Sequence, residues 1–142
     1  MYLLWIEHLV AVADPWLYFV RHLCLKGTSV AEGRWTQQIR KGSTRLAVLQ
    51  LVSERERYGY EIISAIRQRT DGALEVAEGN VYPALHALEA EGYITSTWRE
   101  VESGVPPRKY YRITPRGHEH RSKLVGEWTE FAAAIARLLQ GE

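Results

Sequence analysis

The pattern of apolar residues changes from a helical to an alternating period near residue 93, and this change constrains the fold most strongly. Leu46 to Val52 is apolar nearly all round, as a buried helix is. Apolar residues at helical spacing predict an amphipathic second helix from about Tyr60 to Arg69 and a third from Glu78 to Glu91, with Gly92 as its stop. We therefore expect three helices before the change of period.

Two short segments follow, Ile94 to Val101 and Lys109 to Thr114, and both are rich in Thr, Tyr, Trp, Val and Ile. The turn-forming sequence ESGVPPR separates them, which predicts a β-hairpin. Thr114 followed by Pro115 is typical of an N-cap and a first helical position, so a long helix is expected to about Gln140. The predicted fold class is mainly α with a small β-hairpin (α+β), a winged helix-turn-helix with a long C-terminal helix.

The length of 142 residues suffices for one domain with an accessory segment. Residues 27–43 are rich in Gly, Ser and Thr and predict a linker, so the boundary is placed near Arg40. The predicted division is an apolar extension and linker over 1–39, a DNA-binding domain over 40–114, and a dimerisation helix over 115–142. Residues 1–39 are either a folded addition or an upstream extension, and both alternatives stay open.

The apolar first 25 residues raise the question of a membrane span or a signal peptide. Neither is expected, because no cationic region precedes the run and polar residues or proline interrupt it at Glu7, His8, Asp14, Pro15, Arg21 and His22. The single cysteine, Cys24, is what a reducing compartment permits, so a cytoplasmic protein is expected.

The side chains that catalysis or metal binding would need are poorly arranged. His118 and His120 are two positions apart on a predicted helix and so diverge. No glycine-rich phosphate loop or paired-carboxylate pattern is present. We expect no enzymatic activity, no cofactor and no metal site.

The net charge of +1 does not by itself indicate a polyanionic partner, but basic residues are concentrated in one stretch. Six lie between residues 108 and 123 against one acid: Arg108, Lys109, Arg112, Arg116, Arg121 and Lys123. Arg108, Lys109 and Arg112 belong to the hairpin, where they can bind phosphate oxygens. The alternative is a solvated hairpin edge that its charges protect from aggregation.

The outer face of the third helix supplies the candidates for base readout. Its core face leaves Asn80, Pro83, His86 and Ala87 pointing outward, and Asn80 and His86 can hydrogen-bond base edges or phosphates. The alternative is that Asn80 caps the helix and His86 is a solvated surface residue.

Four motifs in this order, RKGSTRLAVLQLV, YGYEI, EGNVYPALHALEAEGYI and PPRKYYRITPRG, resemble the PadR family of transcriptional regulators over about Arg40 to Leu139. The resemblance implies a sequence-specific DNA-binding regulator, commonly a repressor, with Arg108 and Lys109 gripping the backbone. It also implies that five residues lie at or near the DNA: Tyr60, Asn80, Tyr82, Pro83 and His86. Family members commonly carry Thr or Ser-like residues at the position of Asn80, a departure that bears on which sequence is read.

The last helix carries a seam of coiled-coil type, whose members are spaced four, three, four and three residues apart: Leu124, Trp128, Phe131, Ile135 and Leu138. The seam predicts a homodimer, with packing onto the chain's own first helix as the alternative. A two-fold dimer would set two recognition helices about 34 Å apart on an inverted-repeat operator of double-stranded DNA.

Trp128 stands where PadR-like proteins that sense flat aromatic compounds carry a tryptophan, which raises the possibility of a site for a small planar hydrophobic effector. An ordinary aromatic core position is the commoner explanation. A second alternative concerns the whole chain: a winged helix that binds a protein and has lost DNA binding, as the acidic stretch Asp71 to Glu102 would suggest. The basic hairpin favours DNA.

Overall fold

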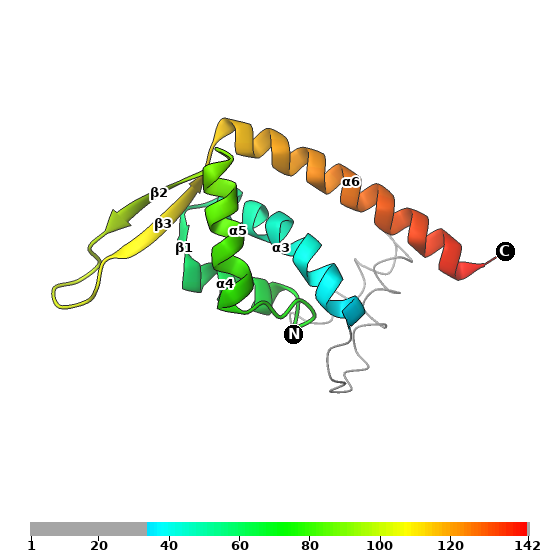
Figure 1. Cartoon of the computed structure of the whole chain (residues 1–142), viewed down its shortest axis with the longest axis horizontal. Helices are drawn as coiled ribbons and strands as arrows, with labels where there is room; N and C mark the ends of the chain where they lie inside the picture. Colours follow the sequence, from blue (N-terminus) through cyan, green and yellow to red (C-terminus); the bar gives the residue numbers. More distant parts are fainter. Residues whose placement is uncertain (1–33, 142) are drawn as a thin grey trace, which may run out of the picture.

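The computed structural model describes residues 34–141, and the predictions made for residues 1–33 lie outside them. Figure 1 shows a group of shorter helices beside a small sheet, from which a long C-terminal helix extends. The elements are α3 (Arg34–Glu54), β1 (Arg57–Tyr58), α4 (Gly59–Arg69), α5 (Glu78–Ala90), β2 (Ile94–Arg99), β3 (Arg108–Ile113) and α6 (Pro115–Gln140). The predicted α+β fold class is confirmed.

One hydrophobic core joins α3, α4, α5 and the root of the sheet. Its fully buried members include Leu49 of α3, Ile62 of α4 and Leu85 of α5, each with no exposed surface. A bidentate pair between Arg45 and Glu91, with N···O distances of 2.9 and 2.5 Å, ties α3 to the end of α5. α3 and α4 therefore form a fixed platform for α5.

A second bidentate pair joins the end of α3 to the end of α4. The guanidinium of Arg69 donates to Glu54 at 2.6 and 2.7 Å. These hydrogen bonds, with smaller contributions from Gln50 and Arg57, hold the pKa of Glu54 at about 2. Glu54 is therefore ionised throughout the physiological range.

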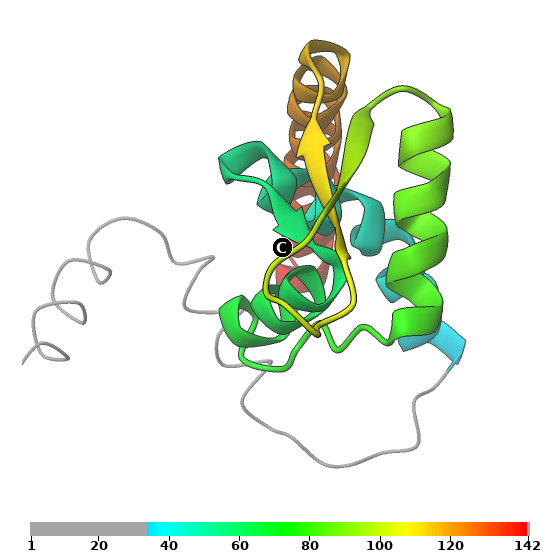
Figure 2. The ribbon, with the colours of Figure 1, turned by 90° about the vertical axis from the view of Figure 1, so that its left-hand side faces the viewer.

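The hairpin is part of a three-stranded antiparallel sheet in the order β1-β3-β2. Its register runs from Ile94 opposite Ile113 to Arg99 opposite Arg108, and residues 100–107 form the tip. β1 was not predicted, because it has only two residues and follows a charged run. Figure 2 shows the hairpin projecting beside α5, in the position of a wing.

The first turn of α6 is fixed directly on the root of the wing. Thr114 is the N-cap, as predicted: its Oγ1 accepts from the backbone N–H of Gly117 at 3.0 Å and donates to the carbonyl of Gly92 at 2.8 Å. A Cβ at Gly117 would lie 2.0 Å from the carbonyl oxygen of Tyr93, so only glycine allows this close approach. Beyond this turn α6 runs past α3 and away from the wing (Figure 1).

The predicted linker over residues 27–43 is wrong from Arg34 onward, because α3 is helical from Arg34 and crosses Arg40 without interruption. Within this stretch Thr44 donates its hydroxyl to the carbonyl of Arg40 at 2.7 Å, one turn earlier. α3 also packs against both α5 and α6. The helix thus continues from its buried turns around Leu49 back through Gly42 and Ser43, despite the low helix propensity of these two residues. Within residues 34–141, no helix combines the length and the apolar character that a membrane span requires.

Candidate nucleic-acid interface

The two faces of α5 differ completely in burial. Val81, Leu85 and Leu88 have no exposed surface, while Asn80 and His86 lie on the exposed side with Tyr82 and Pro83. The N-cap of α5 is Ala77, so the alternative in which Asn80 caps this helix is wrong. The side chain of Asn80 belongs instead to the first turn of the helix, on its exposed side.

Pro83 lies inside α5 and provides no backbone N–H. The carbonyl of Gly79, four residues earlier, consequently cannot receive the usual helical hydrogen bond from residue 83. Both residues are exposed, so this interruption lies on the outer face of the helix. It adds a backbone acceptor to the polar groups there.

α5 has no lysine or arginine, and its only charged residues are Glu78 and Glu89. The attraction that a DNA backbone needs must therefore come from other elements. The wing is one such source, because α5 packs against β2.

A tyrosine pair marks the corner where α4 meets α5. Tyr60, in the first turn of α4, is 62% exposed. Tyr82 packs its ring over the neighbouring residue of α4: a Cβ at Gly59 would lie 2.7 Å from the Tyr82 hydroxyl oxygen. The glycine of the YGYE motif thus makes room for the tyrosine of α5, and both tyrosines reach the surface.

The three predicted wing cations do not share one face. Arg108 and Arg112 lie on one face of β3, and Lys109 lies on the other. The guanidinium of Arg108 stacks over the Tyr58 ring at 4.6 Å. Arg112 donates from Nε to Glu56 at 2.5 Å, and a second ion pair joins its Nη2 to the same carboxylate. Stacking uses the face of a guanidinium and leaves its N–H edge free for a phosphate.

Arg99 is a fourth wing cation, which sequence reasoning missed. It stacks over Tyr110 at 5.0 Å and forms an ion pair with Glu56. The hairpin register could have indicated it, because Arg99 is directly opposite Arg108. Glu56 therefore holds two arginines, and hydrogen bonds from Arg112 and then Arg99 lower the pKa of its carboxyl.

Lys109 is held from within the chain. Its Nζ is 3.2 Å from Oε2 of Glu89 on α5, and Ser96 of β2 donates to the other carboxylate oxygen. The hydrogen bond from Ser96, followed by that from Lys109, lowers the pKa of Glu89. A carboxylate on α5 thus joins both strands of the wing.

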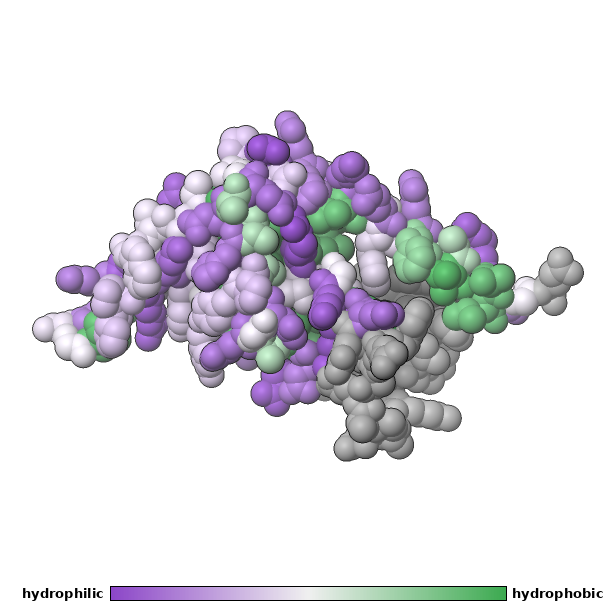
Figure 3. All heavy atoms as spheres, viewed as in Figure 1, coloured by the Kyte–Doolittle hydropathy of each residue, from purple (hydrophilic) through white to green (hydrophobic). Residues whose placement is uncertain are grey.

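The predicted seam of α6 is divided between core and surface. Leu124 packs against the hydrophobic core. Beyond it the seam is exposed at Trp128 (43%), Phe131 (59%), Ile135 (39%) and Leu138 (75%). Figure 3 shows an apolar patch over the C-terminal half of this helix. Packing onto the chain's own first helix therefore does not account for the outer seam.

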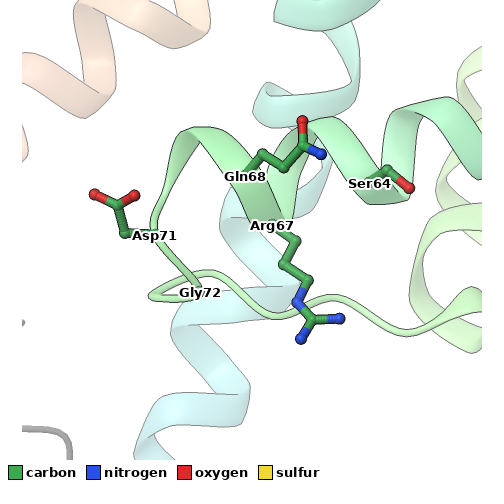
Figure 4. Close-up of a pocket in the computed structure, with 5 residues that line it drawn as sticks. All are labelled: Ser64, Arg67, Gln68, Asp71 and Gly72. Carbon is green, nitrogen blue, oxygen red and sulfur yellow. The ribbon is translucent and has the colours of Figure 1, made fainter.

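A pocket at the end of α4 and the turn that follows it is lined by Ser64, Arg67, Gln68, Asp71 and Gly72 (Figure 4). The side chains of Arg67 and Asp71 point in different directions, and none of the five lining residues has an aromatic or aliphatic side chain. This pocket is poorly suited to a planar hydrophobic effector. Within residues 34–141, no cluster of three His, Cys, Asp or Glu side chains has the arrangement of a metal site.

The model of the PadR-like family of transcriptional regulators matches residues 48–123. The chain belongs to this family. A PadR-like regulator binds DNA and regulates transcription, and the family is not one of enzymes. The predicted family membership is confirmed, whereas the contact residues assigned above remain predictions.

This PadR-like chain is similar to known proteins both in sequence and in structure. It is 36% identical over 101 residues to an uncharacterized protein of Lysinibacillus sphaericus, covering 92% of that protein. It is 34% identical over 85 residues to the transcriptional regulator YqjI of Escherichia coli, but covers only 39% of it. A PadR-like regulator of Bacillus cereus has a TM-score of 0.63 and 34% identity, over 74% of this chain and 99% of that one. A transcriptional regulator of Clostridium thermocellum has a TM-score of 0.65 and 34% identity, over 70% of this chain and 96% of that one.

Proposed function

We propose that this PadR-like regulator is a homodimeric repressor that reads an inverted-repeat operator with α5 and its wing. The observation that carries the proposal is the division of α5 into a fully buried face and an exposed polar one, next to a wing that presents arginines. Base readout needs exposed hydrogen-bonding groups on a rigidly held helix. The buried face provides that rigidity.

Asn80 and His86 are the base-reading residues in this proposal, because they combine exposure with donors and acceptors. Tyr60, Tyr82 and Pro83 position the helix against the sugar-phosphate backbone. Phosphate contacts come from two wing residues: Arg108, whose stacking leaves its N–H edge available, and Arg112, whose side chain is 65% exposed beside its ion pair with Glu56. Each such contact releases counterions and makes binding salt-dependent.

Dimerisation would use the exposed seam of α6. Apolar side chains on its outer turns face solvent in the single chain, and a second copy of α6 would cover them. Two-fold symmetry would then place the two α5 helices about one DNA turn apart, about 34 Å. A dimer bound across a promoter would exclude the polymerase, which is the basis for proposing repression.

The seam also supports the effector proposal. Trp128 is 43% exposed, and its ring centroid is 6.4 Å from that of Phe131, so the pair offers aromatic surface between subunits. A planar hydrophobic compound could stack there and release the operator. Titration of such a compound should quench fluorescence in the wild type and leave a Trp128→Leu variant unchanged.

The test of DNA binding is a fluorescence-anisotropy titration against the DNA upstream of the chain's own gene, with a scrambled duplex as control. Tight, salt-dependent binding to the upstream duplex alone is expected, and His86→Ala and Arg108→Ala should weaken it. His118→Ala, an exposed histidine on α6, is the matched control and should bind as the wild type does. Equal or absent binding to both duplexes would contradict specific regulation and favour the protein-interaction module.

A further inference from the structure

The wing leaves the body of the protein with little support from neighbouring strands. β1 pairs with β3 only at Tyr110 and Tyr111. From Lys109 and Trp98 outward, β2 and β3 pair only with one another. A two-stranded ribbon without a packed face is marginal in water, so its direction must be fixed at the root.

Glu89 lies at this root and contacts both strands. It belongs to the last turns of α5, where its two carboxylate oxygens bind Ser96 of β2 and Lys109 of β3. The side chains of Glu89 and Lys109 are 31% and 27% exposed, so the pair is partly shielded from water. The ammonium of Lys109 also lies over the ring of the buried Tyr111, with Nζ 5.5 Å from the ring centroid.

The same contacts leave Lys109 poorly placed for DNA. It is on the face of β3 that carries the buried Tyr111 and Ile113, whereas Arg108 and Arg112 lie on the opposite face. Its ammonium already has a carboxylate partner on α5. To bind a phosphate, Lys109 would have to leave Glu89 behind as a partly buried, unpaired charge.

We propose that Glu89 and Lys109 form a strut that sets the angle between the wing and α5, so that Lys109 acts on DNA binding by positioning and not by contacting phosphate. The effect on DNA rests on the proposed function above, while the effect on the wing does not. With the strut in place, both reading elements are oriented before they meet the operator. Without it, the wing must be ordered during binding, at a cost in affinity.

The first measurement is amide hydrogen exchange of the full chain without DNA. Lys109→Met keeps the aliphatic stem and removes the charge, and Glu89→Gln removes the opposite charge. Both variants should speed exchange in β2 and β3 about fivefold, as expected for loss of a partly shielded pair, with exchange in α3 unchanged. Lys123→Met on α6 removes the same charge from an exposed site and is the control. Unchanged exchange in the wing would overturn the strut, whatever the chain does with DNA.

The second measurement is the salt dependence of binding to the upstream duplex. Lys109→Met should lower the affinity severalfold and leave the slope of log K against log salt unchanged, because the ordered wing still neutralises the same phosphates. A direct phosphate contact would instead reduce the slope by about 0.9. Glu89→Gln distinguishes a positioning role of Lys109 from a phosphate contact, because the two predict opposite changes in DNA affinity. The strut predicts a lower ratio of specific to non-specific affinity, whereas a Lys109 freed to contact phosphate would make the variant bind DNA more tightly. A reduced slope for Lys109→Met or tighter specific binding by Glu89→Gln would overturn the proposal, and absent binding by the wild type would refute only the proposed function.

Discussion

Replacing each of two glycines of α6 by alanine separates the effect of helix propensity on the free energy of unfolding from the effect of packing. A Cβ at Gly126 meets no heavy atom within 4 Å, whereas at Gly117 it would lie 2.0 Å from the Tyr93 carbonyl oxygen and 2.7 Å from Cγ1 of Ile113. Replacing glycine by alanine within a helix stabilises it by about 0.5–1 kcal/mol at either position. Gly126→Ala should therefore raise the free energy of unfolding by that amount.

At Gly117 the steric term outweighs this gain. The obstructing atom is a backbone oxygen, and it already accepts a hydrogen bond from the Thr114 N–H at 3.0 Å. Overpacking costs about 1–3 kcal/mol, and displacing α6 would also weaken its Thr114 cap, worth about 1 kcal/mol. We expect Gly117→Ala to lower the free energy of unfolding by about 2 kcal/mol after the propensity gain is subtracted.

The measurement is urea unfolding followed by far-UV circular dichroism. Protein concentration must be held constant, because association of the folded chain contributes to apparent stability. Opposite signs for the two variants support the close contact between α6 and the root of the wing. If Gly117→Ala stabilises the protein as much as Gly126→Ala does, that contact is wrong.

Three further predictions concern other parts of the chain. Because the pKa of Glu54 is low, its ion pair adds about 1 kcal/mol, after solvent screening, to the free energy of unfolding above the ordinary pKa of 4.5, and this is lost as the pH falls towards 2. The Glu54→Gln variant should therefore lose less stability than the wild type between pH 6 and 3, and an equal loss would contradict the ion pair. Phe131→Glu should convert a dimer to a monomer in sedimentation velocity, whereas Glu130→Gln should not; a dimeric Phe131→Glu variant would exclude the seam. Gly59→Ala should displace the Tyr82 ring and lower DNA affinity severalfold with little change in unfolding free energy, because the obstructing group is the mobile end of a side chain; unchanged affinity would remove Tyr82 from the interface.

The elements with strong local signals could be predicted from the sequence. The helical spacing of apolar residues and the N-cap sequence Thr114–Pro115 predicted α6 with the bounds that the structure has, from Pro115 to Gln140. The three buried positions of α5 were likewise predicted from helical spacing. In these cases local preference and tertiary packing agree.

The missed features depend on residues far apart in the chain. Glycine, serine and threonine between Arg34 and Ser43 favoured a linker, but α3 continues through them into the turns around Leu49, which are buried against other elements. The carboxylates that pair with the wing cations were missed for the same reason: Glu56 precedes Arg112 by 56 positions, and Glu89 precedes Lys109 by 20. Charge counting found three of the four wing cations, but only the three-dimensional fold shows which of them already have a partner.

The rigid joint between Gly117 and Tyr93 makes α6 a lever. Its 26 residues extend about 39 Å from that joint. Because α6 and the DNA-binding domain turn as one body, a rotation of 5° about the far end of α6 would displace the joint, and the domain with it, by about 3 Å. In a dimer joined through the far ends, the spacing of the two α5 helices would change with any small rotation at the seam.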